Sequence, residues 1–374
     1  MKISDITFTV LRHMLLERYG DAQGLKTHRT TLIVRIDTDD GVVGWGDISN
    51  TPNDVNVAHL REVREALLWQ DPLRTAPMLR RLAALGPRIP AGLDVALADM
   101  RGKIAGLNIA TMLGGTYRDT QPCYASLQNA SDAFDPLPGA VAAAGHAMSL
   151  GFRHIKMKVG WHHPDVDARW VNAVIDSLPP SVDLAIDANR VLDLAASERL
   201  IRGIADTQRI SWFEEPLSNC HPTAYAELRR RIPVPVAGAE SMPLATIEQV
   251  IAGRMMDIVQ PDLIGHGGFA PMLHMLALCD AHGVRLIPHC FDGQLMRVAT
   301  LHLLASRPDW EEKHGKYDAA PVELDISANP VRDELLGGPL RPDHDGRLAV
   351  PTAPGLGVTV NEDFIRRTGQ RLSL

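Results

Sequence analysis

Short apolar segments that end in charged residues alternate with amphipathic stretches between residues 151 and 290. The apolar segments read GFRHIKMKVG (151–160), DLAIDAN (183–189), ISWFEEP (210–216), PVAGAES (235–241), DIVQPDL (257–263) and VRLIPHC (284–290). Helical patterns lie between them at 196–207, 247–254 and 271–283. Strand and helix alternating in this way predict parallel strands joined by right-handed crossovers, and a long series of them closes into a barrel.

The first third of the chain has a different pattern. Alternating runs at 3–11, 30–40 and 41–49 predict antiparallel strands, with Asp39-Asp40-Gly41 as a hairpin turn, and apolar residues at helical spacing follow at 59–70, 76–85 and 91–106. Beyond residue 326 the chain is rich in Pro and Gly, which predicts a mostly irregular tail. We expect an α+β domain at 1–118, an α/β barrel at 119–326 that starts with a strand at 121–127, and a tail at 327–374 that packs back on the first domain.

Charge and cysteine usage narrow the class of protein. The net charge of −7 comes from residues of both signs without a basic run, which argues against a nucleic-acid partner. The four cysteines form no CxxC pair, the N-terminus MKISDITFTV lacks the apolar region of a signal peptide, and no apolar run approaches the roughly 20 residues of a membrane span. We therefore expect a soluble, cytoplasmic protein that is not bound to a membrane.

Lys156 and Lys158 are two residues apart in IKMK, so on a strand both point to the same face. If that face is the barrel interior, mutual repulsion and burial would lower the lysine pKa toward the range of a catalytic base. A solvated lysine pair on an edge strand is the alternative that this pattern allows by itself.

Three carboxylates, Asp187, Glu214 and Glu240, end three successive predicted strands. The carboxyl ends of barrel strands share one rim, where active sites are built, so these groups should converge and repel unless a cation lies among them. Oxygen ligands without His or Cys favour Mg²⁺, or Mn²⁺ in its place, over zinc. A single acid at a strand end is more often a helix cap or a salt-bridge partner, but three in series after KxK favour the metal site. Glu215 should point away, toward the barrel wall or a lysine.

Asp262 and His289 end the next two predicted strands. A carboxylate that hydrogen-bonds an imidazole fixes its tautomer and raises its basicity, so the pair is a candidate base. An ordinary core histidine is the alternative for His289 alone.

In this order, the motifs KMK, DAN, FEEP, GAES, QPDLIGHGG and PHC resemble those of the enolase superfamily, in its mandelate racemase branch. LDVALADMRGKIAGLNIATMLGG (93–115) similarly resembles the end of that family's N-terminal capping domain. The resemblance implies a modified TIM barrel, (β/α)7β, with the capping domain completed by the C-terminal tail, and a symmetric homo-oligomer. The resemblance also implies that Asp187, Glu214 and Glu240 are the Mg²⁺ ligands. It implies that the catalytic groups are Lys158, Lys156, the pair of His289 with Asp262, and Glu323, which follows on a short strand.

One position separates the branches of this family. Muconate cycloisomerases resemble this chain but place a second lysine base where Asp262 stands, so His289 takes that role here. Arg190 after DAN and Phe291-Asp292-Gly293 after His289 depart from the familiar patterns.

The implied chemistry is removal of the α-proton of a hydroxy acid, with the enediolate stabilised by the metal and Lys156. Dehydration of an acid sugar to a 2-keto-3-deoxy acid is the first expectation, racemisation or epimerisation the second, and lactone cycloisomerisation the third. A non-catalytic sugar-acid binding protein and a phosphate-binding barrel enzyme are the other classes considered. Loops near 15–26 and 48–56 should contact the distal end of the substrate. The candidate substrate contacts are Asn189, Lys156, Arg18, Tyr19, His28 and Asn50.

Overall fold

Eight parallel strands form a curled sheet in the computed structural model, which describes residues 1–49, 56–128, 130–131, 137–218, 221–291, 293–310 and 318–374. The strands occur in the order β11-β10-β9-β8-β7-β6-β4-β12. Each predicted apolar segment contains one of them. Their bounds are β4 Thr120–Ser126, β6 His154–Lys158, β7 Asp183–Asp187, β8 Ile210–Glu214, β9 Val236–Gly238, β10 Ile258–Val259, β11 Arg285–Leu286 and β12 Val322–Asp325. The predicted α/β barrel is confirmed.

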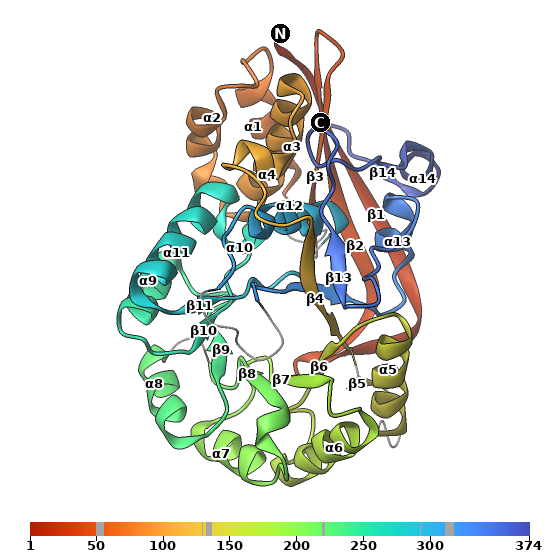
Figure 1. Cartoon of the computed structure of the whole chain (residues 1–374). Coiled ribbons are helices and arrows are strands. Elements are labelled where there is room, and N and C mark those ends of the chain that lie inside the picture. The colour runs from red at the N-terminus through yellow and green to blue at the C-terminus, as the bar shows by residue number, and fades with distance from the viewer. Residues whose placement is uncertain (50–55, 129, 132–136, 219–220, 292, 311–317) are drawn as a thin grey trace.

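Helices cover the outside of this sheet (Figure 1). They are α5 Leu137–Ser149, α6 Pro164–Ser177, α7 Leu194–Arg202, α8 Pro222–Arg231, α9 Leu244–Ala252, α10 Leu263–His266, α11 Phe269–His282 and α12 Gln294–Ala305. The helix predicted at 196–207 ends earlier, at Arg202, because Gly203 caps it and the chain then turns toward β8.

The sheet closes between β11 and β12 through side chains. No ladder joins these two strands within the described ranges. Instead, Cys290 N donates to Glu323 Oε2 at 2.9 Å, and the buried Arg297 of α12 donates to the carbonyls of both Glu323 and Cys290, each at 3.2 Å. The end of β12 is thereby fixed against the chain that follows β11.

The N-terminal domain contains a long antiparallel hairpin, β1 Ile3–Asp21 and β2 Gly24–Thr38, followed by β3 Val43–Ser49. Its helices are α1 Val57–Leu67, α2 Thr75–Arg81, a 3₁₀ turn η1 Ala83–Leu85, α3 Arg88–Ala105 and α4 Ile109–Met112. The prediction of a loop at 15–26 is wrong, because β1 pairs with β2 to the hairpin tip and with β5 Ala130–Ser131 at Tyr19 and Gly20. At the tip, Gln23 Nε2 donates to the Asn189 carbonyl of the barrel at 2.8 Å.

Helix α3 joins the two parts of the molecule. It packs closely on β3, where a Cβ on Gly44 or Gly46 would lie 2.2 Å from a carbonyl oxygen of α3. Two buried aspartates of this domain then accept hydrogen bonds from the N-termini of barrel helices: Asp94 from Phe269 N of α11, and Asp47 from Leu295 N and Met296 N of α12. These bonds satisfy helix donors that otherwise have no intrahelical partner.

The tail is more regular than expected. It contains α13 Pro330–Leu335, β13 Arg347–Ala349, α14 Glu362–Thr368 and β14 Gln370–Arg371. As expected, β14 pairs with β1 of the N-terminal domain, but β13 pairs antiparallel with β4 of the barrel. The tail therefore contacts both parts. Among the described helices, none is long and apolar enough to cross a membrane.

Candidate active site

Lys156 and Lys158 of β6 both face the barrel interior and are buried. Lys156 Nζ donates to Glu214 and lies 2.9 Å from Glu323 Oε1 and 3.5 Å from Asp187 Oδ2. Lys158 Nζ donates to Asp187 Oδ2 at 2.5 Å. The solvated lysine pair is thereby excluded.

The lysines do not have the lowered pKa that was expected from their spacing. Burial lowers the pKa of Lys158, and so does Lys156, but Asp187 and, more weakly, Glu214 and Glu323 raise it by more in total. Burial also lowers the pKa of Lys156, but Glu214, Glu323 and Asp187, together with Tyr124, raise it by more. The prediction considered only the two ammonium groups and omitted the carboxylates that neighbouring strands bring to them.

Asp187 and Glu214 are held firmly at the ends of β7 and β8. Asp187 Oδ1 accepts from Asn189 N at 2.9 Å, and the lysines hold its pKa at about 2 although burial opposes them. Glu214 Oε2 accepts from Trp212 Nε1 at 3.0 Å and from Gln260 Nε2 at 2.7 Å. Burial raises the pKa of Glu214 to about 7, with Asp187 and Glu323 adding to the effect against Lys156.

Glu240 is the third predicted metal ligand. It follows β9, is partly exposed, and places Oε1 3.8 Å from His289 Nδ1. Among the described residues, no three His, Cys, Asp or Glu side chains are arranged around one point as metal ligands would be. The ammonium groups of Lys156 and Lys158 take the positions beside Asp187 and Glu214 instead.

The rim holds more carboxyl groups than permanently charged cations. Its carboxylates are Asp187, Glu214, Glu215, Glu240, Asp262 and Glu323, against the permanent cations Lys156, Lys158 and Arg190. Glu323 Oε1 and Glu215 Oε2 are buried without a hydrogen-bond donor, although each lies near a cation. Such a set of carboxylate oxygens fits a hard divalent cation.

Asp262 and His289 meet as predicted. His289 Nδ1 lies 3.1 Å from Asp262 Oδ2, and Asp262 Oδ1 accepts from Gly265 N, which fixes the carboxylate at the start of α10. Burial lowers the pKa of His289, but Glu240, Asp262 and Glu323 raise it by more, so it lies well above its ordinary value. Glu323 Oε2 is 4.0 Å from His289 Nε2. Thus the short strand β12 does bring Glu323 to the site.

A cavity of about 540 Å³ connects these groups to the N-terminal hairpin. Lys158, Asn189, Glu240 and His289 of the barrel line it, and so does His28 of the hairpin. Of the other predicted substrate contacts, Lys156 lies buried among the carboxylates. Arg18 is exposed and, like Tyr19, is not among the cavity-lining residues, while Asn50 falls outside the described residues.

Arg190 contributes a contact that the sequence did not reveal. Its Nε lies 3.4 Å from Glu215 Oε2, and its Nη1 donates to Ser241 Oγ at 2.8 Å. Glu215 Oε1 in turn accepts from Glu240 N at 3.3 Å. Burial and Glu240 raise the pKa of Glu215 to about 8, although Arg190 opposes them. Glu215 does point away from the lysines, but its cationic partner is an arginine.

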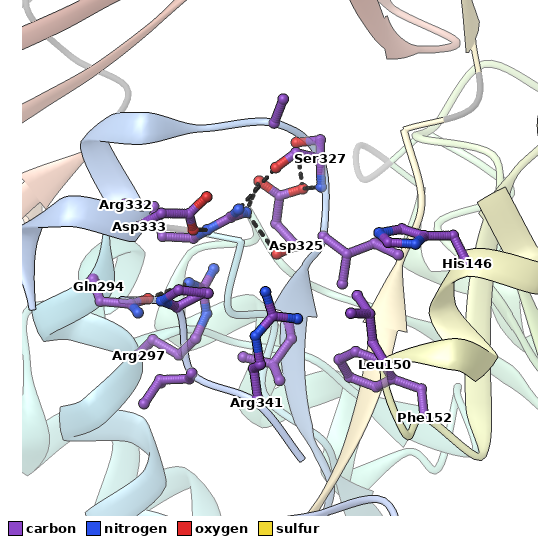
Figure 2. A pocket seen from close by; sticks show the side chains of 15 residues that line it. His146, Leu150, Phe152, Gln294, Arg297, Asp325, Ser327, Arg332, Asp333 and Arg341 are labelled. Atoms are coloured by element: carbon purple, nitrogen blue, oxygen red, sulfur yellow. Dashed lines mark hydrogen bonds and ion pairs between the residues drawn. The ribbon is translucent and has the colours of Figure 1, made fainter. Parts of the chain in front are cut away.

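A second cavity of about 410 Å³ lies beside β12 and contains none of the candidate catalytic groups (Figure 2). At its edge Arg332 donates to the carbonyls of Asp325 and Ser327 and pairs with the Asp325 carboxylate at 3.0 Å. Arg297 donates to Gln294 Oε1 at its base. We interpret this network as the support for the segment that leaves β12.

Comparison with known families identifies the chain. Residues 21–114 match the mandelate racemase/muconate lactonizing enzyme N-terminal domain, and residues 139–364 match the enolase C-terminal domain-like family. The chain belongs to the enolase superfamily, in its mandelate racemase subgroup.

Relatives of this family member match most or nearly all of its length. It is 31% identical to the D-galactarolactone cycloisomerase of Agrobacterium fabrum over 98% of each chain. It is also 31% identical to the L-talarate/galactarate dehydratase of Salmonella typhimurium, over 83% of this chain and 75% of the relative.

Solved structures agree with this assignment. The Salmonella dehydratase liganded with Mg and L-lyxarohydroxamate superposes with a TM-score of 0.84 at 27% identity, covering 100% of this chain and 95% of that one. The 3,6-anhydro-D-galactonate cycloisomerase of Zobellia galactanivorans gives a TM-score of 0.83 at 27% identity, covering 99% and 100% of the two chains.

Proposed function

We propose that this protein is a Mg²⁺-dependent acid-sugar dehydratase that converts a sugar acid to a 2-keto-3-deoxy acid. The observation that carries the proposal is the presence of Lys158 and the His289–Asp262 pair in one cavity. Two proton-transfer groups from separate strands can act on adjacent carbons of one substrate, as the loss of water requires. Dehydratases and a cycloisomerase of acid sugars among its relatives support this choice.

Asp187, Glu214 and Glu240 would hold the metal. Mg²⁺ bound there would supply positive charge for the carboxylate of the substrate and for the enediolate that forms from it. The excess of carboxylates over cations at the rim supports this assignment, and Mn²⁺ has the same ligand preference.

Each catalytic residue has a separate role in this proposal. Lys158 removes the α-proton as the neutral amine, which would form once a cation at Asp187 offsets the carboxylate that raises the pKa of this lysine. The buried ammonium of Lys156 stabilises the charge that develops on the substrate carboxylate. His289, kept protonated by Asp262, donates its proton to the departing 3-hydroxyl. Glu323, fixed by Cys290 N, hydrogen-bonds the intermediate.

A panel of sugar acids tests the proposal. Purified protein with Mg²⁺ is incubated with each acid, and the keto acid is measured as its semicarbazone. At least one acid should yield a keto acid, and Lys158→Ala should abolish the yield. An enzyme that neither forms a keto acid nor exchanges an α-proton with any acid sugar would contradict the proposal.

A second candidate is the opening of an acid-sugar lactone, favoured by the 31% identity to a cycloisomerase over 98% of both chains. In that reaction the group that leaves the β-carbon is the ring carboxylate instead of a hydroxyl. The product therefore has the mass of its substrate, whereas dehydration removes one water. Mass spectrometry of the product separates the two reactions.

A further inference from the structure

Two sets of residues with different chemistry line the catalytic cavity. The barrel contributes the acids and bases described above. The β1–β2 hairpin and the start of α3 contribute the basic residues Lys26, His28, Arg29 and Arg88, with Asp21 as the acid among them. Lys26 lies 4.0 Å from Asp21, so that acid offsets one of these charges. This hairpin side of the cavity therefore has more basic than acidic side chains.

Arg29 is the buried member of this set, with 7% of its surface exposed. Its Nε donates to the Tyr19 hydroxyl at 3.2 Å. The guanidinium lies 4.8 Å from the centre of the Tyr19 ring and 5.0 Å from that of Phe291. No carboxylate of the described residues forms an ion pair with it. Its Nη2 is shielded from solvent and has no hydrogen-bond acceptor.

An arginine in this state is costly for the free protein. A buried charge is normally paired and hydrogen-bonded, because removing it from water is otherwise strongly unfavourable. Ring faces attract the cation but do not replace the in-plane acceptors that guanidinium N–H groups require. Arg29 also lines the cavity, so an anionic ligand could pair with the guanidinium charge through the part of the side chain that faces the cavity, although the shielded Nη2 lies outside its reach.

We propose that Arg29 and the cations around it bind a second carboxylate, so that the substrate is a sugar diacid (an aldarate) and not a monoacid (an aldonate). This inference rests on the proposed function, which places the reacting carboxylate on the barrel side. A cavity of about 540 Å³ has the size of a small-molecule site. Planar carboxylates are the anions that the guanidinium fork fits best.

The surroundings of Arg29 hold it in place. The Tyr19 hydroxyl donates to the Ala328 carbonyl at 2.9 Å and accepts from Ser327 Oγ at 3.0 Å. Ser327 belongs to the segment that Arg332 fixes at the edge of the second cavity (Figure 2). A rigid, already positioned cation loses little entropy when it binds an anion, which favours selectivity.

Matched substrate pairs test the inference. Each pair is a six-carbon aldarate and the aldonate of the same configuration, which differ in having a carboxylate or a hydroxymethyl group at the distal carbon. We expect kcat/KM to favour the diacid by about 100-fold or more, because the monoacid leaves a buried charged group unpaired. The inactive Lys158→Ala variant should bind the diacid more tightly in calorimetry by a similar factor.

Substitutions then assign the effect to the hairpin side of the cavity. Arg29→Gln should bring the diacid-to-monoacid ratio of kcat/KM toward one, and Arg29→Lys should restore part of it. Lys26→Gln, at a partly exposed position, should lower the ratio by a smaller factor. Arg61→Gln, which removes an exposed arginine of α1, is the matched control and should leave the ratio unchanged.

The outcomes separate this inference from the proposed function. Keto-acid formation from aldonates as fast as from aldarates would overturn the diacid assignment and leave the dehydratase proposal standing. The same holds if Arg29→Gln and Lys26→Gln both leave the ratio unchanged. If neither class reacts, both proposals fall.

Discussion

His289 places its Nδ1 3.1 Å from Oδ2 of Asp262, and this contact joins the segment that follows β11 to the segment that follows β10. Gly265 N holds the other carboxylate oxygen, so Asp262 is oriented before substrate binds. The pair keeps the tautomer and the charge of the imidazole fixed.

The first prediction concerns this pair. Asp262→Asn removes a negative charge that raises the pKa of His289, so that pKa should fall. If protonated His289 is the acid, activity is lost as pH rises through its pKa, and the variant should lose activity at a lower pH than the wild type. We expect kcat to fall about 100-fold at neutral pH. The pH profile of kcat measures both effects, and an unchanged alkaline limit would exclude His289 as the acid.

Much of this site could be predicted from the sequence, because residues at the carboxyl ends of parallel barrel strands all lie on the same rim. Asp262 and His289 are 27 positions apart, yet both follow the apolar core of a short strand. The two-residue spacing of Lys156 and Lys158 also placed both lysines on one face of a strand. The spacing alone does not show whether that face is the barrel interior or the solvent side, so a solvated lysine pair remained an alternative.

The sequence failed where a property depends on contacts between distant segments. The pKa of Lys158 is raised because Asp187 lies on the neighbouring strand. Arg29 was missed because its partners, Tyr19 and Phe291, come from two different parts of the fold. The hairpin was predicted too short because the residues near its tip are largely polar. They pair between β1 and β2 without packing in a core, so they lack the apolar alternation by which a strand is predicted.

A second prediction tests how the two domains are joined. Asp47 accepts hydrogen bonds at 3.0 Å from Leu295 N and Met296 N. Asp47→Ala leaves both buried donors without an acceptor and should lower the free energy of unfolding by about 2–4 kcal/mol. Denaturant titration measures the loss. Glu62→Ala, at an exposed site of α1, is the control and should change stability by less than about 0.5 kcal/mol.

The free energy of unfolding should also depend on pH through Asp47. Burial raises its pKa to about 6, although two backbone hydrogen bonds and Arg297 oppose it. A folded-state pKa above the unfolded value means that the folded state binds the proton more tightly, so this group's contribution to stability falls as pH rises from about 4 to 6. Asp47→Asn should remove that decline from the pH dependence of the unfolding free energy. An identical decline in the variant would mean that another group causes it.

A fourth prediction concerns the metal. Mg²⁺ should raise the melting temperature of the wild-type protein, because a ligand that binds only the folded state stabilises it. Glu240→Gln should raise the Mg²⁺ concentration needed for half-maximal stabilisation about 10-fold or more, with the protein still folded. Excess EDTA should abolish turnover and added Mg²⁺ should restore it. Full turnover in EDTA would contradict the assignment of the three carboxylates.

The central claim is that Lys158 and His289 perform two different proton transfers on one substrate. Incubation of the reactive sugar acid in D₂O, with α-deuterium followed by NMR and keto acid by semicarbazide, measures both transfers in each variant. His289→Asn should still exchange the α-proton while losing keto-acid formation, and Lys158→Ala should lose both. The opposite pattern would assign proton abstraction to His289, and wild-type turnover in both variants would contradict the account.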